Sequence, residues 1–251
     1  MIFDAFLTPN FTESEKQFAN SIVVMIDVLR ASTTVCSALT NGAKEVIHCE
    51  TTDKAVHIFN SLSKESRFLG GERDGLKPTG FDAGNSPLDY TEEKIKNRTV
   101  ILSTSNGTKI FQKAKHAKKK IIGGFVNISF VMDYLLDLIK EEDNDDLEIC
   151  FLCAGTNGRS TYEDTLCAGA YLSKLLSLFP NTDLTDTAHS AMNLYELFKD
   201  NLNSFLKSRK HALYLKSLGF EEDIDISLTF DKYPVIPIIE GNSIKRLEDF
   251  Q

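Results

Sequence analysis

Residues 22–34 read IVVMIDVLRASTT, and this stretch decides the fold class. Five apolar residues, 22–26, run without polar alternation into Asp27. Such a run is typical of a strand that is covered on both faces of a parallel sheet. The Ser/Thr-rich continuation predicts a helix over about 32–40, so Asp27 is expected at the carboxyl end of a buried strand, where α/β proteins bind ligands. Capping the next helix or pairing with Arg30 is the alternative role for Asp27.

Strand and helix patterns alternate along most of the chain. Short apolar runs predict strands over 2–8, 46–49, 68–69, 100–102, 121–122, 148–153, 224–230 and 235–239. Helical spacing predicts helices over 52–64, about 108–118, 128–139, 166–176, 186–208 and 211–218. This alternation predicts an α/β layered fold with a largely parallel sheet. Residues 70–90 are rich in Gly, Pro, Asn and Asp and predict one long packed loop.

One internal echo accompanies this pattern. The segments SNGT (105–108) and TNGR (156–159) each follow an apolar strand and precede a helix. Two halves of similar topology would produce such an echo. The alternative is coincidence, since Asn-Gly pairs mark turns in general.

Charge and hydropathy narrow the function classes. With 28 Lys+Arg against 36 Asp+Glu, the net charge is −8, which disfavours a broad nucleic-acid interface. No apolar run approaches the roughly 18 residues of a membrane span, and the first residues lack the basic and apolar regions of a signal peptide. We therefore expect a cytoplasmic protein without membrane contact. The apolar helix faces predicted over 186–218 allow a homodimer.

The five cysteines are expected to be buried free thiols, as in a reducing compartment. Cys150 and Cys153 form a CxxC, but a strand points residues i and i+3 to opposite faces, which disfavours a zinc or redox site. Cys153 and Arg159 also fit the C-x5-R-[ST] pattern of cysteine phosphatases, in which a thiolate attacks phosphorus. Leu152 and Thr156 depart from that pattern, so this chemistry is kept as an alternative.

Polar residues follow three predicted strands at the same kind of place. These are Asp27 with Arg30, Asn106 with Thr108, and Asn157 with Glu163 and Asp164. Glycine- and hydroxyl-rich turns at helix N-termini leave backbone N–H groups free, so a phosphate fits there. Gathered carboxylates are oxygen ligands suited to Mg²⁺. The candidate carboxylates are Asp27, Glu163, Asp164 and Glu72 or Asp82, although Glu163 and Asp164 could merely favour a helix N-terminus.

Longer motifs resemble one family, the Mg²⁺-dependent 2-phosphosulfolactate phosphatases of coenzyme M biosynthesis. The matching segments, in the family's order, are IDVLRASTT (26–34), NGAKEV (41–46), GERDGLKPTGFDAGNSPLDY (71–90), STSNGT (103–108), CAGTNGRSTYEDTLCAGA (153–170), LKSLGFEEDI (215–224) and VIPII (235–239). The combination of GER, GFD-x-GNSP and NGT is long and specific. Together the segments cover most of the chain.

The resemblance implies an α/β fold with three layers, α/β/α, and two subdomains of similar topology. The chain would form a single catalytic domain over 1–251, with a subdomain boundary near 120–145. The implied activity is that of a hydrolase: the phosphate ester of 2-phospho-3-sulfolactate, a small molecule, is hydrolysed to 3-sulfolactate and phosphate. The implied cofactor is Mg²⁺.

The resemblance also implies roles for individual residues. The implied catalytic residues are Asp27, Arg30, Glu163 and Asp164, of which Asp27, Glu163 and Asp164 would hold the metal. The implied substrate-binding residues are Glu72, Arg73, Asp82, Asn85, Asn106, Gly107, Thr108 and Asn157. Arg30 and Arg73 would neutralise phosphoryl or sulfonate oxygens, and the attacking group would be Asp27 or a metal-bound water.

One departure concerns His211. The family carries a His-Gly pair before its last helix, whereas this chain has His211-Ala212. A core or surface role is therefore expected for His211. Two other function classes stay open: a phosphatase acting on another small phosphorylated hydroxy acid, and a non-catalytic binder of an anionic acid, which would not need the carboxylates.

Overall fold

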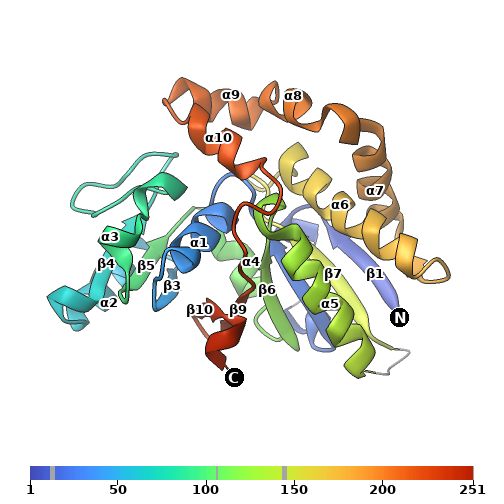
Figure 1. Cartoon of the computed structure of the whole chain (residues 1–251), viewed down its shortest axis with the longest axis horizontal. Helices are drawn as coiled ribbons and strands as arrows, with labels where there is room; N and C mark the ends of the chain where they lie inside the picture. The colour runs from blue at the N-terminus through green and yellow to red at the C-terminus, as the bar shows by residue number, and fades with distance from the viewer. Residues whose placement is uncertain (12–14, 106, 143–145, 251) are drawn as a thin grey trace.

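The structure is a computed structural model that describes residues 1–11, 15–105, 107–142 and 146–250. One mixed sheet of ten strands, in the order β4-β5-β3-β10-β9-β6-β2-β7-β1-β8, runs through the protein (Figure 1). Its strands are β1 (Ile2–Phe6), β2 (Ser21–Ile26), β3 (Glu45–Cys49), β4 (Arg67–Gly71), β5 (Thr99–Ser103), β6 (Lys119–Gly123), β7 (Glu148–Cys153), β8 (Asp183–Leu184), β9 (Pro237–Glu240) and β10 (Ser243–Arg246).

The sheet consists of two parallel blocks joined by an antiparallel hairpin. One block is β4, β5 and β3, and the other is β6, β2, β7, β1 and β8. The hairpin β9–β10 lies between them and pairs antiparallel with β6 and with β3. Strands β1 and β2, from the start of the chain, thus lie in the same block as β7. The subdomain boundary near 120–145 stays a prediction.

Helices cover both faces of the sheet, which confirms the three-layer α/β/α prediction. The helices are α1 (Ala31–Thr40), α2 (Thr52–Ser61), α3 (Glu92–Ile95), α4 (Gly107–Lys113), α5 (Ile128–Glu142), α6 (Tyr162–Leu178), α7 (Asp186–Phe198), α8 (Leu202–Lys207), α9 (Lys210–Ser217) and α10 (Glu221–Ser227). Buried residues of α1 and α4 share one core with one face of the sheet. Residues of α5 to α10 share a second core with the other face, and α2 covers that same face over β3 to β5.

The central strand β2 shows why the sequence selects this fold. All six of its residues are buried. Ile22 and Val24 point into the core beneath α5 and α6, whereas Val23 and Met25 point into the core beneath α1. A strand with an apolar layer on each side must be apolar at every position, because neither face meets water. Strand β7 follows the same rule, and it places Cys150 and Cys153 in opposite cores, as predicted.

Two predictions near the C-terminus are wrong. Residues 224–230 were expected as a strand, but α10 covers Glu221–Ser227. Three acidic residues in its first turn favour the helix N-terminus, and Asp223, Ile224 and Ser227 are buried at helical spacing. The long helix expected over 186–208 is divided into α7, a short 3-10 turn and α8.

Helices α8, α9 and α10 run along the top of the view in Figure 1, above the ends of the central strands. Among the described helices, none combines the length and apolarity that crossing a membrane requires.

Candidate active site

A cavity of about 830 Å³ opens at the carboxyl ends of the parallel strands. Its lining begins with Asp27 after β2, Glu72 after β4, Thr104 after β5 and Thr156 after β7. The start of α9 contributes the remaining side. Parallel strands deliver the residues that follow them to one edge of the sheet, so this is where an α/β fold collects polar groups from distant parts of the chain.

Asp27 lies deep in this cavity, with only 7% of its surface exposed. One carboxylate oxygen accepts the backbone N–H of Ala31 at 3.2 Å, at the start of α1. Burial raises the pKa of Asp27 to about 6, and the negative charges of Glu72 and Glu163 add to this shift. The Ala31 amide and the charge of His211 act in the opposite direction. Asp27 is therefore harder to ionise than a carboxyl group in water.

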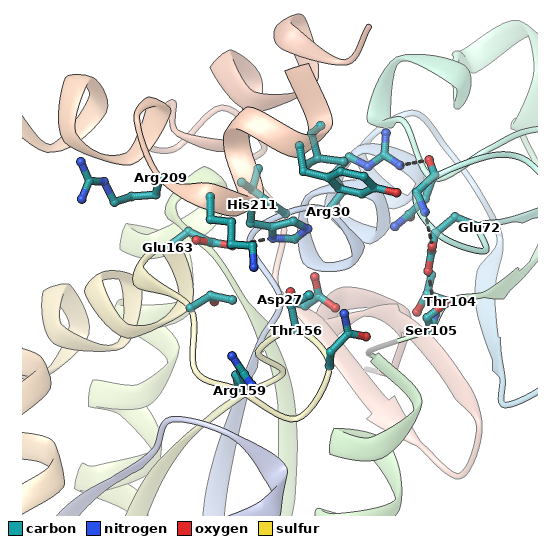
Figure 2. Close-up of a pocket in the computed structure, with 18 of the residues that line it drawn as sticks. Asp27, Arg30, Glu72, Thr104, Ser105, Thr156, Arg159, Glu163, Arg209 and His211 are labelled. Carbon is teal, nitrogen blue, oxygen red and sulfur yellow. Dashed lines mark hydrogen bonds and ion pairs between the residues drawn. The ribbon is translucent and has the colours of Figure 1, made fainter. Parts of the chain in front are cut away.

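Glu163 and His211 form a pair across the cavity. Oε1 of Glu163, in the first turn of α6, lies 2.6 Å from Nδ1 of His211, in α9 (Figure 2). Burial lowers the pKa of His211, but the hydrogen bond and charge of Glu163, with the charges of Asp27 and Asp164, outweigh burial and raise it overall. The expectation of a core or surface His211 is thus corrected: its imidazole lines the cavity. Ala212, which follows it, is buried in the apolar core.

Glu72 lines the cavity and connects two loops. One of its oxygens accepts the N–H of Gly75 at 2.9 Å, and the other accepts the N–H of Ser105 at 2.7 Å. The loop after β4 is thereby tied to the loop after β5. Both oxygens serve the backbone, so Glu72 shapes the cavity and adds negative charge to it.

Asp164 has a different position from its neighbour Glu163. Its two oxygens accept the N–H groups of Val28 and Gly155, each at 2.9 Å, and it does not line the cavity. Burial raises its pKa to about 8, with Glu163 and Asp27 contributing in the same direction and the two amides opposing them. Asp164 thus joins the turn after β2 to the turn after β7. This placement argues against the predicted role as a metal ligand.

Three other predicted site residues form hydrogen bonds within the protein. Arg30 lines the cavity, but Nη1 donates to Asp223 and Nη2 to the carbonyl of Gly75, each at 2.7 Å. Arg73 donates to the carbonyls of Glu72 and Ser103, and Asp82 accepts the N–H of Leu69 at 2.8 Å. Arg73 and Asp82 are outside the cavity lining and hold the loop after β4 in shape.

The predicted asparagines divide into two groups. Asn85 and Asn157 both line the cavity, and Asn157 adopts a left-handed backbone conformation with φ of 53°. Asn85 is 4% exposed, and its Oδ1 has no hydrogen-bond partner within the described residues. Asn106 lies outside the described residues, and the structure gives Gly107 and Thr108 only their place at the start of α4. Asn85 therefore contributes, next to the cavity, a buried oxygen acceptor without a partner in the described part of the chain.

Several lining residues were missed in the sequence. They are aromatic and basic side chains, Arg159, Tyr162, Arg209, Lys210 and Tyr214. Arg159 was considered only as a partner of Cys153, and Tyr162 lay within the quoted segment 153–170 without an assigned role. Arg209, Lys210 and Tyr214 lie in or directly before α9, outside the matching segments and far in sequence from the strand ends. The TNGR turn and the acidic start of α6 could have pointed to residues 156–163 as one unit. Arg159, Arg209 and Lys210 add positive charge to a lining that also contains carboxylates, and Arg209 lies on the same side of the cavity as Glu163 in Figure 2.

The cysteine chemistry finds no support in the structure. Cys153 is fully buried and is not part of the cavity lining. Burial raises the pKa of its thiol well above the usual range, and the nearby Asp164 adds to the shift. A thiol that is neutral and inaccessible cannot attack phosphorus. Arg159 does line the cavity, but without this partner.

Oxygen donors for a metal are present on the cavity surface, although no three His, Cys, Asp or Glu side chains in the described part of the chain are grouped as a metal site. Mg²⁺ commonly takes one or two carboxylates and completes its shell with water and substrate oxygens. Asp27 and Glu163 supply two carboxylates at the cavity, and the unpaired Oδ1 of Asn85 supplies a neutral oxygen. This set fits Mg²⁺ in kind.

Fold and cavity together define an α/β/α protein with an enzyme-type site at the carboxyl edge of its sheet. The family model described as 2-phosphosulpholactate phosphatase matches residues 6–242. The chain therefore belongs to the 2-phosphosulfolactate phosphatase family, as the sequence motifs indicate, and the family is named for a phosphatase.

Relatives from three bacteria support this membership. A protein of Thermotoga maritima is 40% identical over 227 residues, which are 90% of this chain and 92% of the relative. One of Caldanaerobacter subterraneus subsp. tengcongensis is 36% identical over 239 residues, covering 94% and 95%. One of Clostridium perfringens is 35% identical over 250 residues, covering 99% and 97%. Each is named a probable 2-phosphosulfolactate phosphatase.

Proposed function

We propose that this protein is a Mg²⁺-dependent phosphatase that hydrolyses the phosphate ester of 2-phospho-3-sulfolactate to 3-sulfolactate and phosphate. The observation that carries the proposal is the meeting of Asp27 with the Glu163–His211 pair in one buried cavity. The family and the names of the relatives support this choice of substrate. We further propose that the enzyme acts in coenzyme M biosynthesis and in the cytoplasm.

The basic residues of the cavity lining suit this substrate. A phosphorylated sulfolactate carries a phosphate, a sulfonate and a carboxylate, all anionic. Arg159, Arg209 and Lys210 line the cavity and offer guanidinium and ammonium donors, which bind such oxygens well. The protein as a whole carries a net charge of −8, so these local cations are needed to attract an anion.

Asp27 and Glu163 would hold Mg²⁺, with Asn85 as a further oxygen donor. When bound, the metal would neutralise charge on the phosphoryl oxygens. The raised pKa of Asp27 supports this assignment. Burial and nearby carboxylates make the ionised form of Asp27 unfavourable, and a bound cation would stabilise that form. Asp164 would act indirectly, by fixing the two turns that carry Asp27 and residues 156–163.

The chemical step breaks the bond between phosphorus and the ester oxygen, and it adds a water oxygen to phosphorus. Asp27 would either attack phosphorus itself, with water then hydrolysing the aspartyl phosphate to free Asp27 and release phosphate, or orient the attacking water. His211, whose pKa is raised, would hold a proton at its imidazole and deliver it to the departing alkoxide. Glu163 would keep that imidazole in place through Nδ1.

Two other functions use the same cavity. A different phosphorylated hydroxy acid could contact the same carboxylates and cations. The choice of substrate therefore rests more on the sequence family than on the geometry of the cavity. A non-catalytic binder of an anionic acid would need the cations but not Asp27, Glu163 and His211 together. The presence of all three favours an enzyme.

The experiment is phosphate release from a panel of phosphorylated hydroxy acids that includes 2-phosphosulfolactate, measured with Mg²⁺, with EDTA and after iodoacetamide. We expect 2-phosphosulfolactate to be hydrolysed fastest, EDTA to abolish the activity and iodoacetamide to spare it. Asp27→Asn should be inactive, while Asp133→Asn, an exposed change on α5, should match the wild type. Full activity of Asp27→Asn would refute the proposal, and binding of the acids without phosphate release would favour the binder.

A further inference from the structure

Asp223, in α10, contacts two walls of the cavity without lining it. Its Oδ2 accepts from Nη1 of Arg30 at 2.7 Å, and its Oδ1 accepts from Oγ of Ser86 at 2.6 Å. The side chain is 2% exposed, as is that of Arg30. One buried carboxylate thus joins α10 both to the turn after β2 and to the loop after β4.

Arg30 is held from three sides at this junction. Besides the bond to Asp223, Nη2 donates to the carbonyl of Gly75 at 2.7 Å. The guanidinium carbon lies 4.1 Å from the centroid of the Phe220 ring, just before α10. Arg30 is three residues beyond Asp27, so its position and that of Asp27 are set by the same turn. A planar guanidinium with donors on several edges suits a fixed joint of this kind.

The segment formed by α9, α10 and residues 218–220 is called the cover here. Its α9 end also contacts the cavity walls: Nδ1 of His211 meets Glu163 at 2.6 Å, and the hydroxyl of Tyr214 donates to the carbonyl of Asp74 at 2.8 Å. Gly75 lies directly beneath the cover, since a Cβ there would come within 2.9 Å of Leu218. The cover therefore contacts the walls of the cavity through both helices, and α9 lines the cavity itself.

We propose that Asp223 is a positioning residue for the active site: by holding Arg30 and Ser86, it fixes the cover so that His211 reaches Glu163 beside Asp27. The inference rests on the proposed function, because it gives His211 a part in the reaction. A buried ion pair is weak support for stability when compared with apolar packing, but it is directional, so it fixes geometry. Catalytic side chains need such support from residues behind them.

The test compares Asp223→Asn with Asp225→Asn. Asp225 is two residues further along α10, is about half exposed and pairs with Lys207 at 2.6 Å. Asp223→Asn keeps the size of the side chain but removes the charge that Arg30 requires. We expect kcat for 2-phosphosulfolactate to fall about a hundredfold, as a small misplacement of a catalytic group can cause, with KM less affected. Asp225→Asn should match the wild type.

A second readout is independent of activity. The ring N–H proton of His211 in its hydrogen bond to Glu163 can be followed by NMR and assigned by its loss in His211→Gln. Asp223→Asn should shift or broaden this signal, whereas Asp225→Asn should leave it in place. In addition, Asp223→Asn should have little further effect on kcat in the His211→Gln background, since its action is transmitted through His211.

The positioning role is refuted if Asp223→Asn lowers the urea midpoint but leaves both kcat and the His211 signal unchanged, or if its effect on kcat adds fully to that of His211→Gln. If Asp223→Asn fails to fold, Ser86→Ala is the replacement variant, because it removes one hydrogen bond to Asp223 and leaves the Arg30–Asp223 pair intact. It should shift the ring N–H signal of His211, by less than Asp223→Asn would. A wild type that hydrolyses none of the acids would defeat the proposed function, while the NMR comparison would still decide whether Asp223 places His211.

Discussion

His211 and Glu163 meet across the cavity, with Nδ1 of the imidazole 2.6 Å from Oε1 of the carboxylate. The contact joins α9 to the first turn of α6 and spans 48 residues of sequence. It brings a proton-carrying group into a cavity whose lining contains both carboxylates and basic side chains. The geometry thus supplies an acid beside Asp27, which the strand ends alone do not provide.

The first prediction concerns His211→Gln. Glutamine can still form a hydrogen bond to Glu163 but cannot carry the proton that the leaving alkoxide needs. We expect kcat to fall by about 10²–10³-fold, the usual range for loss of a general acid. Phosphate release at saturating substrate measures this directly.

The control is His189→Gln, on the exposed side of α7, which should leave kcat unchanged. Thermal melts of both variants would show whether the fold persists. A His211→Gln enzyme that keeps at least half of the wild-type kcat would remove His211 from the mechanism.

A second prediction concerns the thiols. All five cysteines are buried, so native protein should take up no iodoacetamide at any of them, whereas protein in urea should take up five equivalents. Mass spectrometry of the intact chain counts the labels. Cys153→Ala should retain the wild-type kcat, because this thiol neither lines the cavity nor ionises readily. Inactivation that parallels labelling of Cys153 in the native protein would restore the thiol mechanism.

Most of the fold could be predicted from local pattern. The apolar run before Asp27 and the one ending at Cys153 belong to strands buried on both faces, and such strands leave a clear sequence signature. The hairpin of β9 and β10 was only half predicted, since three of the four residues of β10 are polar and half-buried and the strand lacks an apolar run. For α10, the alternation in IDISLTF suggested a strand, whereas the acidic first turn and tertiary burial of Asp223 favour the helix.

The site was predictable only in part. Each strand end could be located, and Asp27, Glu72 and Glu163 do line one cavity. Glu163 and Asp164 are adjacent in the chain, yet only Glu163 lines the cavity, whereas Asp164 accepts two backbone N–H groups. Local sequence could not show this difference, because the direction of each side chain depends on where α6 begins. The contribution of α9 was also beyond reach: Arg209, Lys210 and His211 arrive at the cavity through packing of the last helices, which no spacing rule predicts.

A third prediction concerns Asp164→Ala. The substitution leaves the N–H groups of Val28 and Gly155 without their acceptor in a buried place. Each unpaired buried group costs roughly 1–3 kcal/mol, so for two groups we expect a loss of about 2–6 kcal/mol in the free energy of unfolding. Urea titration at neutral pH is the measurement, with Asp133→Ala on exposed α5 as the control. A loss no larger than that of the control would show that Asp164 does not join the two turns.

The last prediction concerns the pH dependence of stability and His48. This residue is buried in β3 and stacked on Phe111, with ring centroids 4.1 Å apart. Burial lowers the pKa of His48 from 6.5 to about 4, with nearby Lys54 and Arg73 contributing and Glu50 opposing. Between pH 6.5 and about pH 4, His48 is mostly protonated in the unfolded chain but mostly neutral in the folded protein. Unfolding therefore takes up a proton, and the free energy of unfolding falls as the pH falls from 6.5 towards 4.

The expected contribution of His48 between pH 7.5 and pH 5 is roughly 2 kcal/mol, from about 1.4 kcal/mol per pKa unit. His48→Gln removes the titrating group. When the pH is lowered from 7.5 to 5, the decrease in the free energy of unfolding should therefore be roughly 2 kcal/mol smaller in the variant than in the wild type. Subtracting the two urea titrations cancels the contributions of Asp27 and Asp164, whose raised pKa values act in the opposite direction in both proteins. His57→Gln, on the exposed face of α2, should keep the wild-type pH dependence. If His48→Gln keeps it as well, the imidazole of His48 is accessible to protons in the folded state and its burial does not control its charge.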